Sequence, residues 1–101
     1  MERIDGKIEG PFVIDRDMQI YGMVTVAATV EPGCTLRLHG MVTGDLTVKP
    51  GGTAYVHGMV NGAVINEGGN VEVHGTVDRV VDTGTTTTFI HPDSRVRGTW
   101  G

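Results

Sequence analysis

Histidine is the residue type in this sequence best suited to metal binding or acid–base chemistry, and it recurs at a nearly constant spacing. The recurring positions, where each turn is expected to start, are Asp5, Tyr21, His39, His57, His74 and His91. The steps between them are 16, 18, 18, 17 and 17 residues. A repeat this short corresponds to one turn of a wound strand, so we expect the four imidazoles to stack in one outward-facing column.

This histidine column has two chemical interpretations. Neighbouring imidazoles about 4.8 Å apart can share a divalent metal ion, which makes all four histidines metal candidates. However, no column of cysteine, aspartate or glutamate lies beside them to complete a tetrahedral site. We therefore favour a ladder of stacked rings, and we predict no catalytic residue and no cofactor. Stacked imidazoles repel one another when protonated, so the fold is expected to lose stability below about pH 6.

The elements that must position the histidines are short β-strands. Gly, Val and Thr are the most frequent residues, and no segment has the periodicity of an amphipathic helix. Apolar residues alternate with polar ones around each histidine, as Leu36 and Leu38 do before His39. Because the alternation agrees from turn to turn, these side chains should share one core. The sequence predicts an all-β fold: a single-stranded parallel β-helix (β-solenoid) of about five turns, 16–18 residues per turn, in one domain over residues 1–101.

Three inward columns are expected after each histidine position. The first holds Ile8, Val24, Val42, Val60 and Val77. The second holds Phe12, Ala28, Leu46, Val64 and Val81, and the third holds Ile14, Val30, Val48, Asn66 and Thr83. A glycine follows most of the histidine positions, and we expect a tight corner there rather than a phosphate-binding loop, because no helix follows.

The hand of the winding has two possibilities. Aliphatic residues recur at every sixth position from Val24 to Val60, as they do in left-handed β-helices of hexapeptide repeats. The pattern fails at Asn66 and slips by one residue before Val71. Turns of 16, 17 and 18 residues are more natural for a right-handed helix, whose loops vary in length. We therefore favour the right-handed form.

Three methionines form the first candidate contact surface. Met23, Met41 and Met59 each lie two residues after a position of the histidine column. Alternation places them on the outside, where a row of soft, adaptable side chains is suited to binding another surface. The alternative is a phase shift of one residue at the corner, which would bury them.

The ends of the solenoid form the second candidate surface. The first turn carries an apolar rung that consists of Ile8, Phe12, Ile14, Met18 and Ile20. The segment that precedes this rung looks too short to cover it. At the other end, residues 92–101 are expected to form a partial cap that lays Trp100 over the core. An open first turn would recruit a second copy. If that end alone is free, closed dimers are favoured, whereas filaments require that Trp100 does not cap.

Four segments carry a resemblance to a known family. They are residues 42–48 (VTGDLTV) and 60–64 (VNGAV), flanked by 36–38 (LRL) and 71–73 (VEV). This pattern resembles the bactofilins, the polymer-forming bacterial cytoskeletal proteins, over roughly residues 5–90. The resemblance implies a compact right-handed β-helix with no catalytic site and no nucleotide, which associates with itself head to tail or end to end.

Composition and charge exclude some classes of partner. A net charge of -4 with eight Lys plus Arg argues against nucleic acid or an anionic membrane as partner. Cys34 is the single cysteine, and neither a signal peptide nor a membrane span is evident, so we expect a cytoplasmic protein. Our first hypothesis is a non-enzymatic, self-assembling structural protein. The alternative is a small protein-binding module, of the inhibitor or toxin-immunity type, that uses an outward face. A left-handed β-helix enzyme of the acyltransferase or carbonic anhydrase type is a third, poorly supported class.

Overall fold

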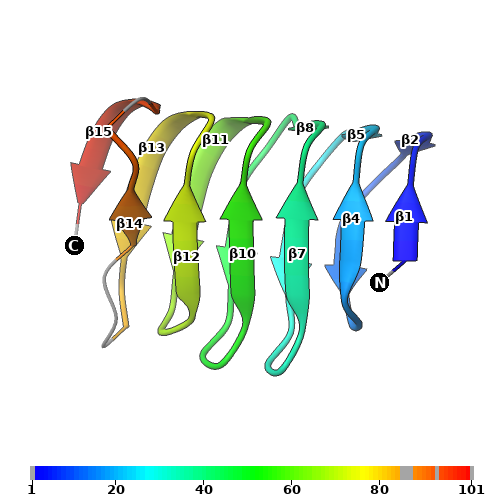
Figure 1. The fold of residues 1–101 in the computed structure, drawn as a ribbon, viewed down its shortest axis with the longest axis horizontal. Helices are drawn as coiled ribbons and strands as arrows, with labels where there is room; N and C mark the ends of the chain where they lie inside the picture. Colours follow the sequence, from blue (N-terminus) through cyan, green and yellow to red (C-terminus); the bar gives the residue numbers. More distant parts are fainter. Residues whose placement is uncertain (1, 85–87, 93, 101) are drawn as a thin grey trace.

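The structure is a computed structural model that describes residues 2–84, 88–92 and 94–100, the last three of these by their backbone alone. All regular elements of the described chain are β-strands, and all their pairings are parallel. The molecule measures 31 × 25 × 21 Å. The predicted parallel β-solenoid of about five turns is confirmed (Figure 1).

Each turn contributes one strand to a first sheet. These strands end just before the positions of the histidine column. In order across the sheet these strands are β1 (Glu2–Ile4), β4 (Met18–Ile20), β7 (Thr35–Leu38), β10 (Thr53–Val56), β12 (Asn70–Val73) and β14 (Phe89–Ile90).

The rest of each turn belongs to a second sheet. In the first three turns it is split into two short strands: β2 (Lys7–Ile8) and β3 (Phe12–Ile14), β5 (Met23–Val24) and β6 (Ala28–Val30), β8 (Met41–Val42) and β9 (Leu46–Val48). In later turns one longer strand covers both parts: β11 (Met59–Asn66), β13 (Thr76–Asp82) and β15 (Arg95–Trp100). Because β11 pairs with both β8 and β9, it joins the two parts into one sheet.

The winding is right-handed. In Figure 1 the strands of the first sheet run upward in front, and the chain then crosses over the top and returns behind them. Each turn lies to the left of the one before it, so the path advances as a right-handed screw.

The core is the stack of inward columns that the alternation predicts. Leu38, Val42, Leu46 and Val48 of the central turns are completely buried, as are their counterparts in neighbouring turns. Each fully buried Val or Leu side chain stabilises the fold by roughly 1.5–3 kcal/mol. The central turns, which are covered on both sides, therefore hold most of the core.

Two predicted columns change register in the fifth turn. Val80, not Val81, pairs with Val64 and is buried, and Asp82, not Thr83, pairs with Asn66. The strand pairing shifts between Val60 and Ala63, so the missing residue of this 17-residue turn lies at the corner. Counting at a constant offset from His74 therefore misplaced the two residues.

The first turn is better covered than the sequence suggests. Residues 2–4, expected to be too short for a cap, form β1 and pair with β4. Met18 is 3% exposed and Ile14 is completely buried, so neither can belong to the open surface predicted for this end. Ile4, Ile8 and Phe12 are half-buried and define the end that remains.

The last residues continue the solenoid. Residues 95–100, expected within a partial cap, form β15, which pairs with β13 from Thr76↔Arg95 to Val81↔Trp100. The segment adds a further rung to the second sheet, and Val96 stacks on Val77. The predicted placement of the Trp100 side chain over the core lies outside the described residues.

Candidate functional site

A column of glycines forms the corner between the two sheets, directly after the histidine column. A Cβ atom on Gly40 would lie 1.8 Å from the carbonyl oxygen of Gly22, and one on Gly58 would lie 1.9 Å from that of Gly40. Those carbonyls accept hydrogen bonds from the next turn, as Met41 N–H donates to Gly22 at 3.0 Å. From Gly22 to Gly75, the close stacking of the corner therefore excludes any side chain.

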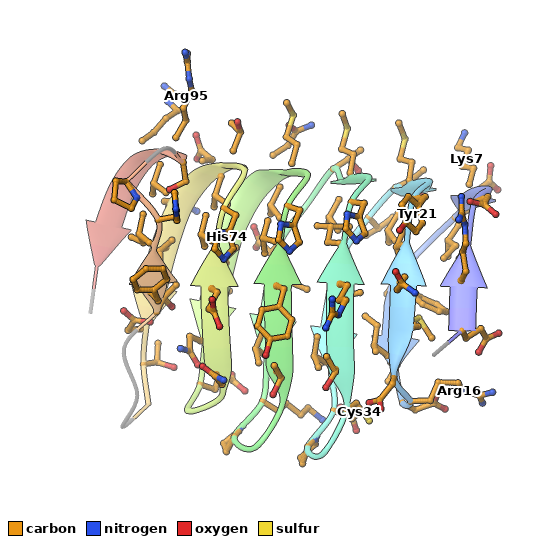
Figure 2. All side chains as sticks on the ribbon, in the orientation of Figure 1. Lys7, Arg16, Tyr21, Cys34, His74 and Arg95 are labelled. Carbon is orange, nitrogen blue, oxygen red and sulfur yellow. The ribbon has the colours of Figure 1, made fainter. Side chains whose placement is uncertain are left out.

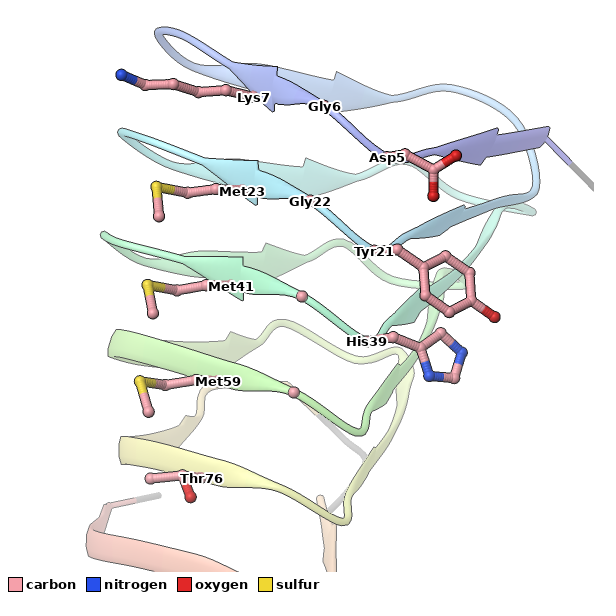
Figure 3. Close-up of a pocket in the computed structure, with 12 residues that line it drawn as sticks. Asp5, Gly6, Lys7, Tyr21, Gly22, Met23, His39, Met41, Met59 and Thr76 are labelled. Carbon is pink, nitrogen blue, oxygen red and sulfur yellow. The ribbon is translucent and has the colours of Figure 1, made fainter.

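A groove follows from this lack of side chains. It has a volume of about 610 Å³ and runs along the solenoid axis, with the glycines as its floor. Figure 3 shows the methionines on one side of the floor and Asp5, Tyr21 and His39 on the other. The sequence shows the glycines but not the groove, because the groove depends on how closely successive turns approach.

One wall of the groove is the methionine column. Met23 pairs with Met41, and Met41 pairs with Met59, so the three side chains stand in register on neighbouring turns. Met59 is 36% exposed and the other two are half-buried, which excludes the alternative in which all three lie in the core. Lys7 precedes the column and Thr76 follows it (Figure 3).

The other wall includes Tyr21 and His39, which belong to a longer ladder of stacked rings. The centroids of Tyr21 and His39 are 4.5 Å apart, those of His39 and His57 are 5.1 Å apart, and both pairs lie within 8° of parallel. His57 and His74 follow at 5.0 Å, and His91 lies 5.1 Å from His74 with a tilt of 39°. The guanidinium of Arg3 lies 4.1 Å from the Tyr21 ring and closes the stack by a cation–π contact. The predicted ring stack is present.

The ring geometry gives the histidine column little capacity for a divalent metal. Parallel rings present their faces, rather than their nitrogens, to one another. Among the residues that the structure describes, no three His, Cys, Asp or Glu side chains are grouped so that they could hold an ion. His74 Nε2 instead lies 3.2 Å from Glu72 Oε1.

The stack does impose a pH dependence. Burial lowers the pKa of His57 below its usual 6.5, and the charges of His74, His39 and Arg37 lower it further. At His57 the unfolded chain therefore binds more protons than the folded chain below about pH 6.5, so the contribution of this residue to stability falls as the pH falls through that value.

We expect the melting temperature to be lower at pH 5.5 than at pH 7.5, measured by circular dichroism. His57→Phe preserves a ring in the stack but removes one titrating group, so it should reduce the difference between the two pH values. An equal melting temperature for the wild type at pH 7.5 and 5.5 would show that the stack carries no such repulsion.

A comparison of the chain with protein-family models, curated proteins and solved structures finds no match. In the described part of the chain, no helix is long and apolar enough to span a membrane. Function must therefore be argued from the geometry of the solenoid itself.

The structure divides the predicted contact residues into two places. Met23, Met41 and Met59 line the groove, whereas Ile8 and Phe12 lie at the first turn. Sequence reasoning missed two residues of that end, Ile4 and Arg3, because the segment before Asp5 has no glycine or histidine that marks it as a turn. The signal that was available is the polar Arg3 followed by the apolar Ile4, which matches Gln19 and Ile20 of the next turn.

Proposed function

We propose that this chain is a non-enzymatic structural protein, of the bactofilin kind, that associates with itself by stacking the first turn of one copy on the last turn of another. The observation that carries the proposal is the chemical complementarity of the two ends. Both ends display the same columns, so a head-to-tail contact would continue each column from one copy into the next.

The apolar columns match at such a junction. Ile4 begins the column that Ile90 ends, through Ile20 and Val73. Ile8 similarly begins the column that Val96 ends. All four terminal side chains are only half-buried in the single copy and pack against the core. Stacking Ile90 on Ile4 and Val96 on Ile8 would complete their burial, which is the main favourable term in such an association.

Two polar pairs and one cation–aromatic pair match as well. Glu9 would meet Arg97, whose side chain is 85% exposed although its guanidinium lies 3.1 Å from Asp78. Asp5 would meet His91, and the guanidinium of Arg3 would meet Phe89, which is 52% exposed.

Lys7 and Arg95 would form an unfavourable pair. They stand at opposite ends of the same edge (Figure 2). Both are exposed, so salt screens their repulsion.

Unpaired strand edges supply the hydrogen bonds. Among the described strands, β1, β2 and β3 each have a neighbour on one side only, as do β14 and β15 at the other end. Exposed edges of this kind template the addition of a further strand. A contact between two different ends does not close on itself, so the expected product is a filament rather than a dimer.

Sedimentation velocity over a concentration series tests this proposal. Phe12→Asp places a charge at the first turn, where the half-buried Phe12 borders the apolar end, and we expect it to leave the protein monomeric. Val13→Asp is the matched control at the adjacent position, because Val13 is 52% exposed and points away from the core. A wild type that is strictly monomeric at high concentration contradicts self-assembly.

Charge-reversal variants test whether the contact joins the first turn of one copy to the last turn of another. Glu9→Arg and Arg97→Glu should each weaken association, and combining both in one chain should restore it, because the pair is then reversed rather than lost. If only Glu9→Arg has an effect, the contact joins two first turns and the head-to-tail arrangement is wrong.

A further inference from the structure

We propose that the methionine column is a binding site for a soft monovalent metal ion of the Cu(I) or Ag(I) class. The observation is a coincidence of two lengths. The bond from zinc to a cysteine sulfur is about 2.3 Å long. With metal–sulfur bonds of similar length, an ion held in line between two thioether sulfurs would separate those sulfurs by about 4.6 Å. Adjacent strands of a parallel ladder repeat at about 4.8 Å. Stacked methionines on neighbouring turns therefore stand at the separation that such an ion requires.

The three side chains have the disposition that this binding needs. Met23, Met41 and Met59 follow one another in register and extend in the same direction, with their sulfurs near the tips of the side chains (Figure 3). None is buried in the core, and Asn61 Nδ2 lies 3.8 Å from Met41 Sδ, so this sulfur faces polar surroundings at the surface. An ion can reach the column from solvent without any opening of the fold.

Ligand chemistry selects the class of ion. Thioethers are soft, neutral ligands that favour Cu(I) over Zn²⁺, Mg²⁺ or Ca²⁺. Asp5, Tyr21 and His39 lie across the glycine floor from the sulfurs and point away from them (Figure 3). These three harder donors therefore do not join the site. A thioether carries no proton near neutral pH, so binding should not depend on pH in the way that imidazole ligation does.

Met41 is common to both possible pairs. Met23 with Met41 forms one pair, and Met41 with Met59 forms the other. The second pair is favoured, because Lys7 precedes Met23 and its cationic Nζ, although 3.6 Å from Glu9 Oε1, opposes a positive ion there. Thr76, which follows Met59, carries no charge.

The test is titration of the full chain carrying Cys34→Ser, because the free thiol of Cys34 would itself bind silver. The titrant is silver(I) nitrate in chloride-free buffer, and binding is followed by calorimetry and by the methionine methyl signals in NMR spectra. Ag(I) is the probe because it does not change oxidation state in air. We expect the methyl signals of Met41 and Met59 to shift on binding. The signal of Met18, which is 3% exposed in the core, should stay in place.

Leucine variants make the expectation quantitative, because leucine keeps the apolar volume and removes the sulfur. Met41→Leu breaks both pairs and should weaken Ag(I) binding by more than about tenfold. Met23→Leu leaves the Met41–Met59 pair and should bind nearly as the wild type does. Met18→Leu is the buried control and should have no effect.

The pH of the titration separates the thioethers from the histidine column. An affinity that changes little between pH 7.5 and 5.5 supports thioether ligation, because protons compete with a metal ion for imidazole but not for a thioether. Binding that is lost at pH 5.5 would overturn the proposal, and so would binding that Met41→Leu leaves unchanged. Because Met41 and Met59 lie away from both ends of the solenoid, these outcomes do not depend on whether the protein self-associates.

Discussion

Gly40→Ala is expected to unfold the protein or to destabilise it by at least about 3 kcal/mol. The added Cβ atom would lie 1.8 Å from the carbonyl oxygen of Gly22 and 2.8 Å from two backbone carbons of the same turn. These neighbours are main-chain atoms held by the hydrogen bonds of the ladder, so no side chain can rotate to make room. The free energy of unfolding, from urea denaturation followed by circular dichroism, measures the effect.

Gly6→Ala is the matched control for this substitution. Gly6 occupies the first position of the same glycine column, but a Cβ atom built there meets nothing within 4 Å. Neither Gly6 nor Gly40 has a positive φ, so the two variants differ in packing and not in backbone strain. Equal stability of Gly40→Ala and Gly6→Ala would mean that the turns are not stacked as closely as the structure has them.

Asn66→Val is expected to destabilise the protein by about 2 kcal/mol or more, although valine restores the apolar pattern of its column. Val30 and Val48 occupy the equivalent positions in the two preceding turns. Asn66 is completely buried, and its Oδ1 accepts the N–H groups of Gly68 at 3.1 Å and Gly69 at 2.8 Å. Valine offers no acceptor, so two N–H groups of the turn would lose their partner.

The free energy of unfolding of Asn66→Val, from thermal and urea denaturation, is compared with that of Asn70→Val, which serves as the control. Asn70 lies at the start of β12, where its side chain is exposed. We expect Asn70→Val to stay within about 0.5 kcal/mol of the wild type, as surface substitutions usually do. An Asn66→Val protein as stable as the wild type would show that the hydrogen bonds of Asn66 do not hold the turn.

The winding and the ring stack were predictable because they follow from period alone. In a parallel solenoid, residues one turn apart become direct neighbours, so a recurring histidine becomes a stacked histidine. The same logic placed Leu38 and Val42 in the core and Met41 on the surface. These inferences require a repeat length but no knowledge of side-chain packing.

The remaining features depend on distances that a sequence pattern does not contain. Val80 replaces Val81 in the core because the one-residue deletion lies at the corner, which periodicity cannot locate within the turn. The cover over Met18 comes from a three-residue strand, β1, that is too short to show a period of its own. The groove exists because Gly22 and Gly40 approach closely, a fact about the backbone and not about composition.

Intermolecular disulfide formation tests end-to-end stacking most directly. In a background that carries Cys34→Ser, one preparation carries Glu9→Cys and another carries Arg97→Cys. Stacking head to tail would bring the two thiols about one strand spacing, roughly 4.8 Å, apart, which is close to the span that a disulfide bridges. The account predicts disulfide-linked dimers when the two preparations are mixed, and none when either is oxidised alone. Dimers of Glu9→Cys by itself, or no linkage in the mixture, would contradict it.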